Sequence, residues 1–165
     1  MELKKRKPNR LKGYDYSLPG SYLLTICTLK RERLFSSVVR SNERRCYTVE
    51  LTEYGEIAEA AINNIPEIYP LATVDSFIIM PNHIHIMLTL HTSGGGRPMV
   101  APTRADVIMQ QLKGYITKKA GRRMWQKSFY DHIIRNAQDY EGGLEYIRTS
   151  PDMWIRNSHY FEKSE

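Results

Sequence analysis

The stretch VDSFIIMPNHIHIMLTL, residues 74–90, decides the fold. Two runs rich in β-branched and other apolar residues, 74–80 and 83–90, lie on either side of the turn signal Pro81–Asn82. Apolar runs separated by a short turn predict two antiparallel strands joined as a hairpin. The segments on both sides of this hairpin define the rest of the architecture.

Further strands and helices are predicted upstream and downstream of the hairpin. Thr52 is a candidate N-cap for one helix and Thr103 for another, Gly121 is expected to end the second, and Pro151 is expected to end the last. Charged residues 31–45 predict a loop, and the glycine-rich segment 91–103 predicts a flexible connection. The predicted elements are strand 21–29, short strand 47–51, helix 52–65, strands 74–80 and 83–90, helix 103–120, strand 129–135 and helix 137–149.

This order of elements predicts an α+β fold with a ferredoxin-like βαββαβ core. Its antiparallel sheet carries helices on one face, and a C-terminal helix follows the core. We expect a basic N-terminal arm at 1–13, a single domain at 14–151 and a tail at 152–165. The second face of the sheet is then expected to be open to a substrate.

Composition narrows the possible partners and location. The chain has 165 residues, 41% of them hydrophobic, which suits one globular domain. The net charge of +6 favours a polyanionic partner, either nucleic acid or an anionic membrane. No apolar run is long enough to span a membrane, and no apolar segment follows the basic start as in a secretory signal. Cys27 and Cys46 lack CxxC spacing, which argues against a disulfide framework, so we expect a reducing, cytoplasmic location. Since no apolar run could span a membrane, we also expect no membrane partner.

Two histidines on the strand 83–90 are the first candidate site. His83 and His85 share one face of the strand, about 7 Å apart, which lets both imidazoles meet one divalent ion. The alternative is two unrelated surface histidines. A histidine-triad nucleotide hydrolase would need a third histidine where Met87 stands, and structural zinc would need cysteine partners nearby.

One of the 11 tyrosines is the second candidate. On helix 137–149 an apolar stripe, which predicts the packed side, contains Ala137, Tyr140, Leu144 and Ile147. Tyr146 belongs to another stripe, with Asp139, Gly142, Gly143 and Ser150. Adjacent glycines are costly inside a helix and predict a close approach of another backbone. A phenolic hydroxyl directed at a metal site is a competent nucleophile for a phosphodiester, although an amphipathic surface tyrosine is the alternative.

Three motifs together resemble a known family. MPNHIHIML (80–88), MWQKSFYDHIIRN (124–136) and DYEGGLEYIRTSP (139–151) are similar to motifs of the IS200-like, single-tyrosine (Y1) HUH transposases. The likeness is strongest to the REP-associated tyrosine transposases, in which GRPMVAPT (96–103) also has a counterpart.

The resemblance implies a chemistry and a substrate. His83 and His85 would hold Mg²⁺ or Mn²⁺, and Tyr146 would form a 5′-phosphotyrosine and release a 3′-hydroxyl. The substrate would be single-stranded DNA beside an imperfect hairpin, and the protein would act as a monomer or a homodimer. Relatives usually have Gln or Asn as a further metal ligand four residues after the tyrosine. Ser150, a weaker ligand, stands there.

Two alternatives follow from these motifs. A hairpin-binding protein that has lost cleavage is suggested by Ser150. A replication-initiator or relaxase-type nickase is disfavoured by the short chain and the motif order.

Phosphate contacts are expected from basic side chains, which give salt-dependent affinity with little sequence information. The candidates are Lys113, Lys118, Lys119, Arg122, Arg123, Lys127 and Arg148, together with Lys4, Lys5, Arg6, Lys7 and Arg10 of the arm.

Overall fold

The computed structural model describes residues 11–92 and 102–162, with side chains described as far as Asn157. Most of the predicted N-terminal arm, including its five candidate DNA contacts Lys4, Lys5, Arg6, Lys7 and Arg10, lies outside the described residues. Most of the glycine-rich connection 91–103 lies outside them as well.

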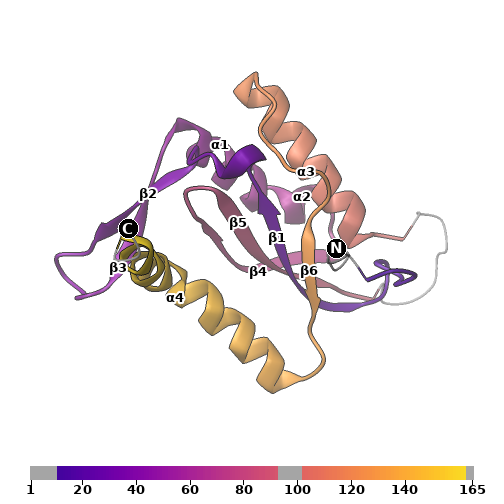
Figure 1. The fold of residues 1–165 in the computed structure, drawn as a ribbon. Helices are drawn as coiled ribbons and strands as arrows, with labels where there is room; N and C mark the ends of the chain where they lie inside the picture. Colours follow the sequence, from indigo (N-terminus) through magenta and orange to yellow (C-terminus); the bar gives the residue numbers. More distant parts are fainter. Residues whose placement is uncertain (1–10, 93–101, 163–165) are drawn as a thin grey trace, which may run out of the picture.

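Four strands form one antiparallel sheet in the order β4-β5-β1-β6 (Figure 1). This order, with one helix after β1 and another after β5, confirms the predicted ferredoxin-like core. The strand predicted at 83–90 has the predicted bounds. The strands are β1 (Gly20–Cys27), β4 (Ala72–Ile79), β5 (His83–Leu90) and β6 (Tyr130–Ile133).

Three helices cover one face of the sheet: α1 (Glu53–Asn63), the short α2 (Ile65–Ile68) and α3 (Ala105–Ala120). Ile84 and Ile86 of β5 are fully buried in the core on this side, as the alternation predicted. The hydroxyl of Thr52 accepts a hydrogen bond from the Gly55 amide, which confirms the predicted N-cap of α1.

The ends of α3 confirm one prediction and correct another. Gly121 has a left-handed backbone with φ of 70° and ends the helix, as predicted. The predicted cap at Thr103 is wrong, because Arg104 occupies the N-cap position and its side chain caps no helical amide. Arg104 instead pairs with Asp106 in the first turn, at 3.0 Å.

A fourth helix, α4 (Ala137–Glu162), crosses the other face of the sheet (Figure 1). The prediction that the last helix ends before Pro151 is wrong, because α4 continues through this proline. A proline inside a helix removes one backbone donor, and contacts with the rest of the fold offset that loss. One such contact lies beyond the proline, where the Asp152 carboxylate accepts a hydrogen bond from the Tyr47 amide at 3.1 Å.

A second correction concerns the charged segment after β1. Residues 31–45, predicted as a loop, contain strand β2 (Ser36–Arg40), which pairs with β3 (Tyr47–Leu51) in a separate two-stranded sheet. The short 3-10 helix η1 (Leu29–Arg31) precedes it. Because β2 is short and obtains its backbone partners from β3, its own composition gave little signal. Within the described ranges, no helix combines the length and apolar character that crossing a membrane requires.

Candidate metal and nucleophile site

The predicted histidine pair lies on β5, on the face of the sheet that α4 covers. The rings of His83 and His85 have centroids 4.7 Å apart and are inclined at 71°. His85 retains only 5% of its exposure. The histidines therefore share one face, as predicted, but the expectation that this face is open is wrong, because α4 packs over it.

Each imidazole is held through its Nδ1 atom. His83 Nδ1 lies 2.7 Å from the Asn82 side-chain oxygen, and His85 Nδ1 lies 2.7 Å from the hydroxyl of Thr25, its cross-strand neighbour. With the proton on Nδ1 and donated to these oxygens, each Nε2 keeps a free lone pair. This second interaction of the ring is what orients metal-binding histidines.

Both imidazoles are neutral at physiological pH. Burial lowers the pKa of His83 from 6.5 to about 4, and the nearby positive charge of Arg31 adds to the effect. Burial, with a smaller contribution from His83, lowers the pKa of His85 to about 3. The neutral imidazole is the form that coordinates a metal ion, so the environment favours ligation.

Tyr146 of α4 faces the histidines. Its ring centroid lies 5.0 Å from that of His85, and the residue is 43% exposed. These side chains, with Ser150, Trp154 and Asn157, line a pocket of about 120 Å³. The two predicted candidates thus meet in one concave site, although they are 61 residues apart in the chain (146 minus 85).

A glycine determines how closely α4 approaches the sheet. Gly143 is buried, and a Cβ atom at this position would overlap the terminal methyl of Met87 on β5. The predicted close approach is therefore correct at Gly143, although the neighbour is a side chain rather than a backbone. Gly142 faces open space, so the same prediction is wrong there.

The predicted packing stripe of α4 is only partly correct. Ile147 is buried, but Ala137 is exposed and Leu144 is half-buried. Tyr140 is also half-buried, and its hydroxyl donates to Asp75 on β4 at 2.7 Å. The side that packs on the sheet lies between the two predicted stripes.

Ser150, the weak point of the predicted metal site, is buried beside the pocket. Its hydroxyl donates to the Tyr146 backbone carbonyl at 2.6 Å, one turn earlier in the helix. No third His, Cys, Asp or Glu joins the two histidines in a metal-binding group within the described part of the chain.

Sequence reasoning missed several side chains at or near the pocket, among them Trp154, which lines it. Asn157 was missed because the helix was predicted to end earlier. Arg31 and Arg33 are exposed, and the Arg33 guanidinium lies 5.3 Å from the centre of the Trp154 ring. The predicted fold could have indicated the two arginines. Cys27 at the end of β1 pairs with His83 at the start of β5, so residues just after β1 lie near the histidines.

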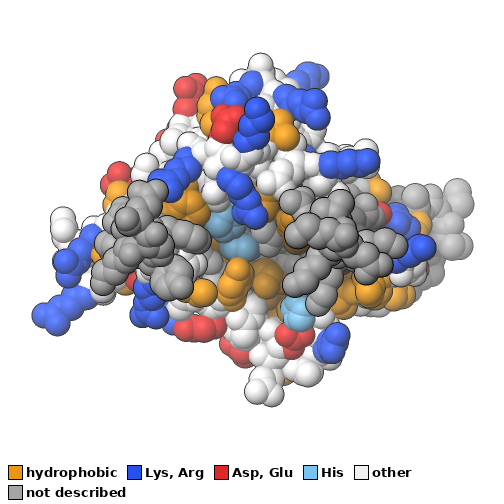
Figure 2. Space-filling model, in the orientation of Figure 1, with side chains coloured by type: hydrophobic (Ala, Val, Ile, Leu, Met, Phe, Trp, Pro, Cys, Tyr) orange, Lys and Arg blue, Asp and Glu red, His pale blue; other side chains and the backbone are white. Residues whose placement is uncertain are grey.

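Figure 2 shows Lys and Arg side chains above the His side chains near the centre of this face, with hydrophobic side chains below them. Among the predicted DNA contacts, Lys113 is half-buried and donates to the carbonyls of Gln126 and Ser128 at 2.8 and 2.7 Å. Arg122 pairs with Glu32 at 3.1 Å, and Arg148 pairs with Glu145. The remaining candidates in the described residues are exposed: Lys118, Lys119, Arg123 and Lys127.

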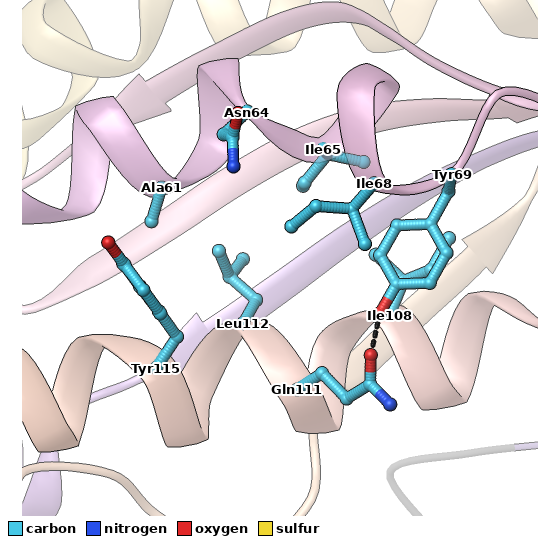
Figure 3. Close-up of a pocket in the computed structure, with 9 residues that line it drawn as sticks. All are labelled: Ala61, Asn64, Ile65, Ile68, Tyr69, Ile108, Gln111, Leu112 and Tyr115. Carbon is cyan, nitrogen blue, oxygen red and sulfur yellow. Dashed lines mark hydrogen bonds between the residues drawn. The ribbon is translucent and has the colours of Figure 1, made fainter.

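An apolar groove of about 210 Å³ lies between α1, α2 and α3, away from the histidines (Figure 3). Its polar groups include the Tyr69 hydroxyl, which donates to the Gln111 side chain. The groove contains no titratable pair comparable to the histidines, so the chemistry-bearing site is the α4 pocket.

The chain is similar in sequence to known proteins at 27–28% identity. No family model matches the chain. An uncharacterized Haemophilus influenzae protein is 28% identical over 175 residues, covering 95% of this chain and 94% of that protein. A second Haemophilus influenzae protein, provisionally named a REP-associated tyrosine transposase, is 27% identical over 71% of this chain and 68% of its own length. The REP-associated tyrosine transposase of Escherichia coli is 28% identical over 47% of this chain and 43% of its own length.

A solved structure shares the fold. It is a REP-associated tyrosine transposase bound to a REP hairpin, with a TM-score of 0.63, 20% identity, and coverage of 87% of this chain and 73% of that one. The likeness extends over the four-stranded sheet and its helices, so the two proteins have the same fold. The chain is thus similar in sequence to REP-associated tyrosine transposases, and it shares the fold of a solved one.

Proposed function

We propose that this protein nicks and rejoins single-stranded DNA beside a hairpin, with Tyr146 as the nucleophile. The observation that carries the proposal is the ring of Tyr146, 5.0 Å from that of His85 in a shared pocket. A reactive phenol beside two neutral, oriented imidazoles is a suitable arrangement for metal-assisted phosphoryl transfer.

The residues present fit a divalent cation, Mg²⁺ or Mn²⁺. His83 and His85 offer two neutral Nε2 atoms on the same side of one strand, with their Nδ1 atoms already bonded. When bound, the cation would polarise the scissile phosphate and stabilise negative charge on the departing oxygen. Tyr146 is 43% exposed, so a phosphate can reach its hydroxyl from solvent.

The proposed step balances without an outside reactant. The Tyr146 oxygen loses its proton and attacks phosphorus, and the bond from phosphorus to the 3′ oxygen breaks. The 3′ oxygen takes up a proton, and the phosphate stays on the tyrosine as a 5′-phosphotyrosine. Because the covalent link conserves the phosphodiester, attack by a 3′-hydroxyl reverses the step and joins strands without ATP.

A single chain is sufficient for this site. The tyrosine helix packs on the chain's own sheet through Gly143 and Met87, and the Tyr140 hydroxyl bonds to Asp75. We therefore propose that a monomer presents Tyr146 to its own histidines. A cytoplasmic location stays a prediction, with which the free thiols of Cys27 and Cys46 are consistent.

Hairpin binding is proposed from the basic surface and from the relative solved with a REP hairpin. Exposed lysines and arginines near the site would contact phosphates, and the arm at 1–13 would add more charge. Sequence preference would come from other contacts, because phosphate contacts carry little sequence information.

The test is formation of a covalent adduct. The full chain is incubated with Mn²⁺ and labelled single strands that carry an imperfect hairpin, and adducts are separated on a denaturing gel. We expect a labelled protein band that requires Mn²⁺ and disappears in Tyr146→Phe. Tyr115→Phe is the matched control, because Tyr115 is 50% exposed on another helix. An adduct that persists in Tyr146→Phe would contradict the assignment.

One observation favours a second candidate, a hairpin-binding protein without cleavage. The Ser150 hydroxyl, which stands where relatives have a metal-ligating amide, is committed to the Tyr146 carbonyl. If the protein binds hairpins but binds no Mn²⁺ at His83 and His85, even at millimolar concentration, this second function holds instead.

A further inference from the structure

We infer that Asn157 supplies the third protein ligand of the metal site, in place of Ser150. The inference rests on the proposed function, because it presupposes a cation at His83 and His85. It assigns the ligand to a residue 11 positions after the tyrosine rather than 4 (157 and 150 against 146).

Ser150 is poorly placed to act as a strong ligand. Its hydroxyl proton is donated to the Tyr146 carbonyl at 2.6 Å, and the residue is 7% exposed. A hydroxyl that donates to a carbonyl of its own helix is held toward the backbone, and only its lone pairs are left to offer to a cation. Hard divalent cations also prefer carboxylate, amide carbonyl and water oxygens to a serine hydroxyl.

Asn157 lines the same pocket as the two histidines and Tyr146. With about 3.6 residues per turn, positions 146, 150 and 157 fall on one side of α4, at one turn and about three turns from the tyrosine. The side chain is exposed, and no described residue forms a hydrogen bond with its amide. An unengaged amide oxygen in the same pocket as the two imidazoles would supply a third ligand to a cation held there.

The part of α4 that carries Asn157 is anchored at the site. The Asp152 carboxylate accepts a hydrogen bond from the Tyr47 amide, just after Pro151. The Trp154 ring lies 6.0 Å from that of His83, so the turn before Asn157 already contacts the metal-binding side chains. Continuation of the helix through Pro151 is therefore what brings the amide to the pocket.

The test measures Mn²⁺ affinity of the full chain directly, from the electron paramagnetic resonance signal of free Mn²⁺. We expect Asn157→Ala to weaken binding by about 10-fold and Asn157→Asp to tighten it by about 10-fold, because a carboxylate is a stronger oxygen ligand. A loss of local structure would weaken binding in both variants, so tightening by Asp is specific to ligation. Ser150→Ala is expected to stay within about twofold of the parent.

Two controls separate the possible failures. Asn63→Ala removes an exposed helical asparagine on α1, far along the chain from the site, and should leave affinity unchanged. His85→Ala should abolish binding. Affinity lost in His85→Ala but unchanged in both Asn157 variants would overturn this inference and leave the proposed metal site intact. A 10-fold loss in Ser150→Ala would overturn it in favour of Ser150. Binding that does not depend on His85 would overturn the proposed metal site itself.

Discussion

The two adjacent glycines of α4 allow a sharp test of how the tyrosine helix is held. Replacing glycine by alanine inside a helix stabilises it by about 1 kcal/mol, because alanine loses less backbone entropy on folding. Gly142 faces open space, so Gly142→Ala should raise the free energy of unfolding by this amount. Gly143 is buried, and its new methyl would overlap the terminal methyl of Met87.

At Gly143 the same substitution should lower the free energy of unfolding or leave it unchanged. Met87 is fully buried, so its end can move only by disturbing its neighbours. Adding a methyl group to a packed core costs about 1 to 3 kcal/mol, which offsets or exceeds the helical gain. Gly143→Ala should therefore lie about 1 to 3 kcal/mol below Gly142→Ala in unfolding free energy.

Urea unfolding followed by far-UV circular dichroism measures this difference. The Met87→Leu background is the control, because leucine is similar in volume but has no terminal methyl at that point. In that background the penalty of Gly143→Ala should shrink, which a double-mutant cycle detects. Equal stabilisation by both alanines in the parent protein would refute the contact between α4 and β5.

Three further outcomes follow from the described contacts. The lowered pKa values of His83 and His85, about 4 and 3 against 6.5, mean that the unfolded chain takes up more protons below pH 6.5. The metal-free protein should then lose about 2 kcal/mol of stability for each imidazole between pH 8 and pH 5, and an unchanged urea midpoint would contradict their burial. Lys113→Met should lower the unfolding free energy by about 2 kcal/mol, because two backbone carbonyls lose a charged donor, and should leave the salt dependence of DNA binding unchanged. Tyr140→Phe should lower the free energy of thermal unfolding by less than about 1 kcal/mol, because the hydrogen bond from the Tyr140 hydroxyl to Asp75 is partly solvated. A larger decrease would mean that this hydrogen bond contributes more to the packing of α4 on the sheet.

Local patterns predicted the features that depend on local geometry. Alternation along 83–90 placed the isoleucines in the core and the histidines on the opposite face, since side-chain direction in a strand has a period of two. Helical geometry separated Tyr146 from Tyr140, and the pair of glycines indicated a close approach, which Gly143 makes.

Features that depend on distant partners escaped sequence reasoning. Strand β2 is formed through its pairing with β3, and α4 continues through Pro151 while the segment beyond it bonds to Tyr47. Local proline rules predicted a helix end there and so concealed Asn157. The packing of α4 over the histidine face was likewise unpredicted, because nothing in the strand itself shows that a helix returns to cover it.

Pro151 separates the pocket residues of α4 into two groups, one before it in the chain and one after it. Pro151 has no N–H group for the Ile147 carbonyl, so the helix is easiest to bend at this point. Tyr146 lies before the proline on the segment fixed by Gly143, and Trp154 and Asn157 lie after it. Under the proposed function, a bend at Pro151 that broke the Asp152–Tyr47 hydrogen bond would widen one wall of the pocket while Tyr146 kept its place.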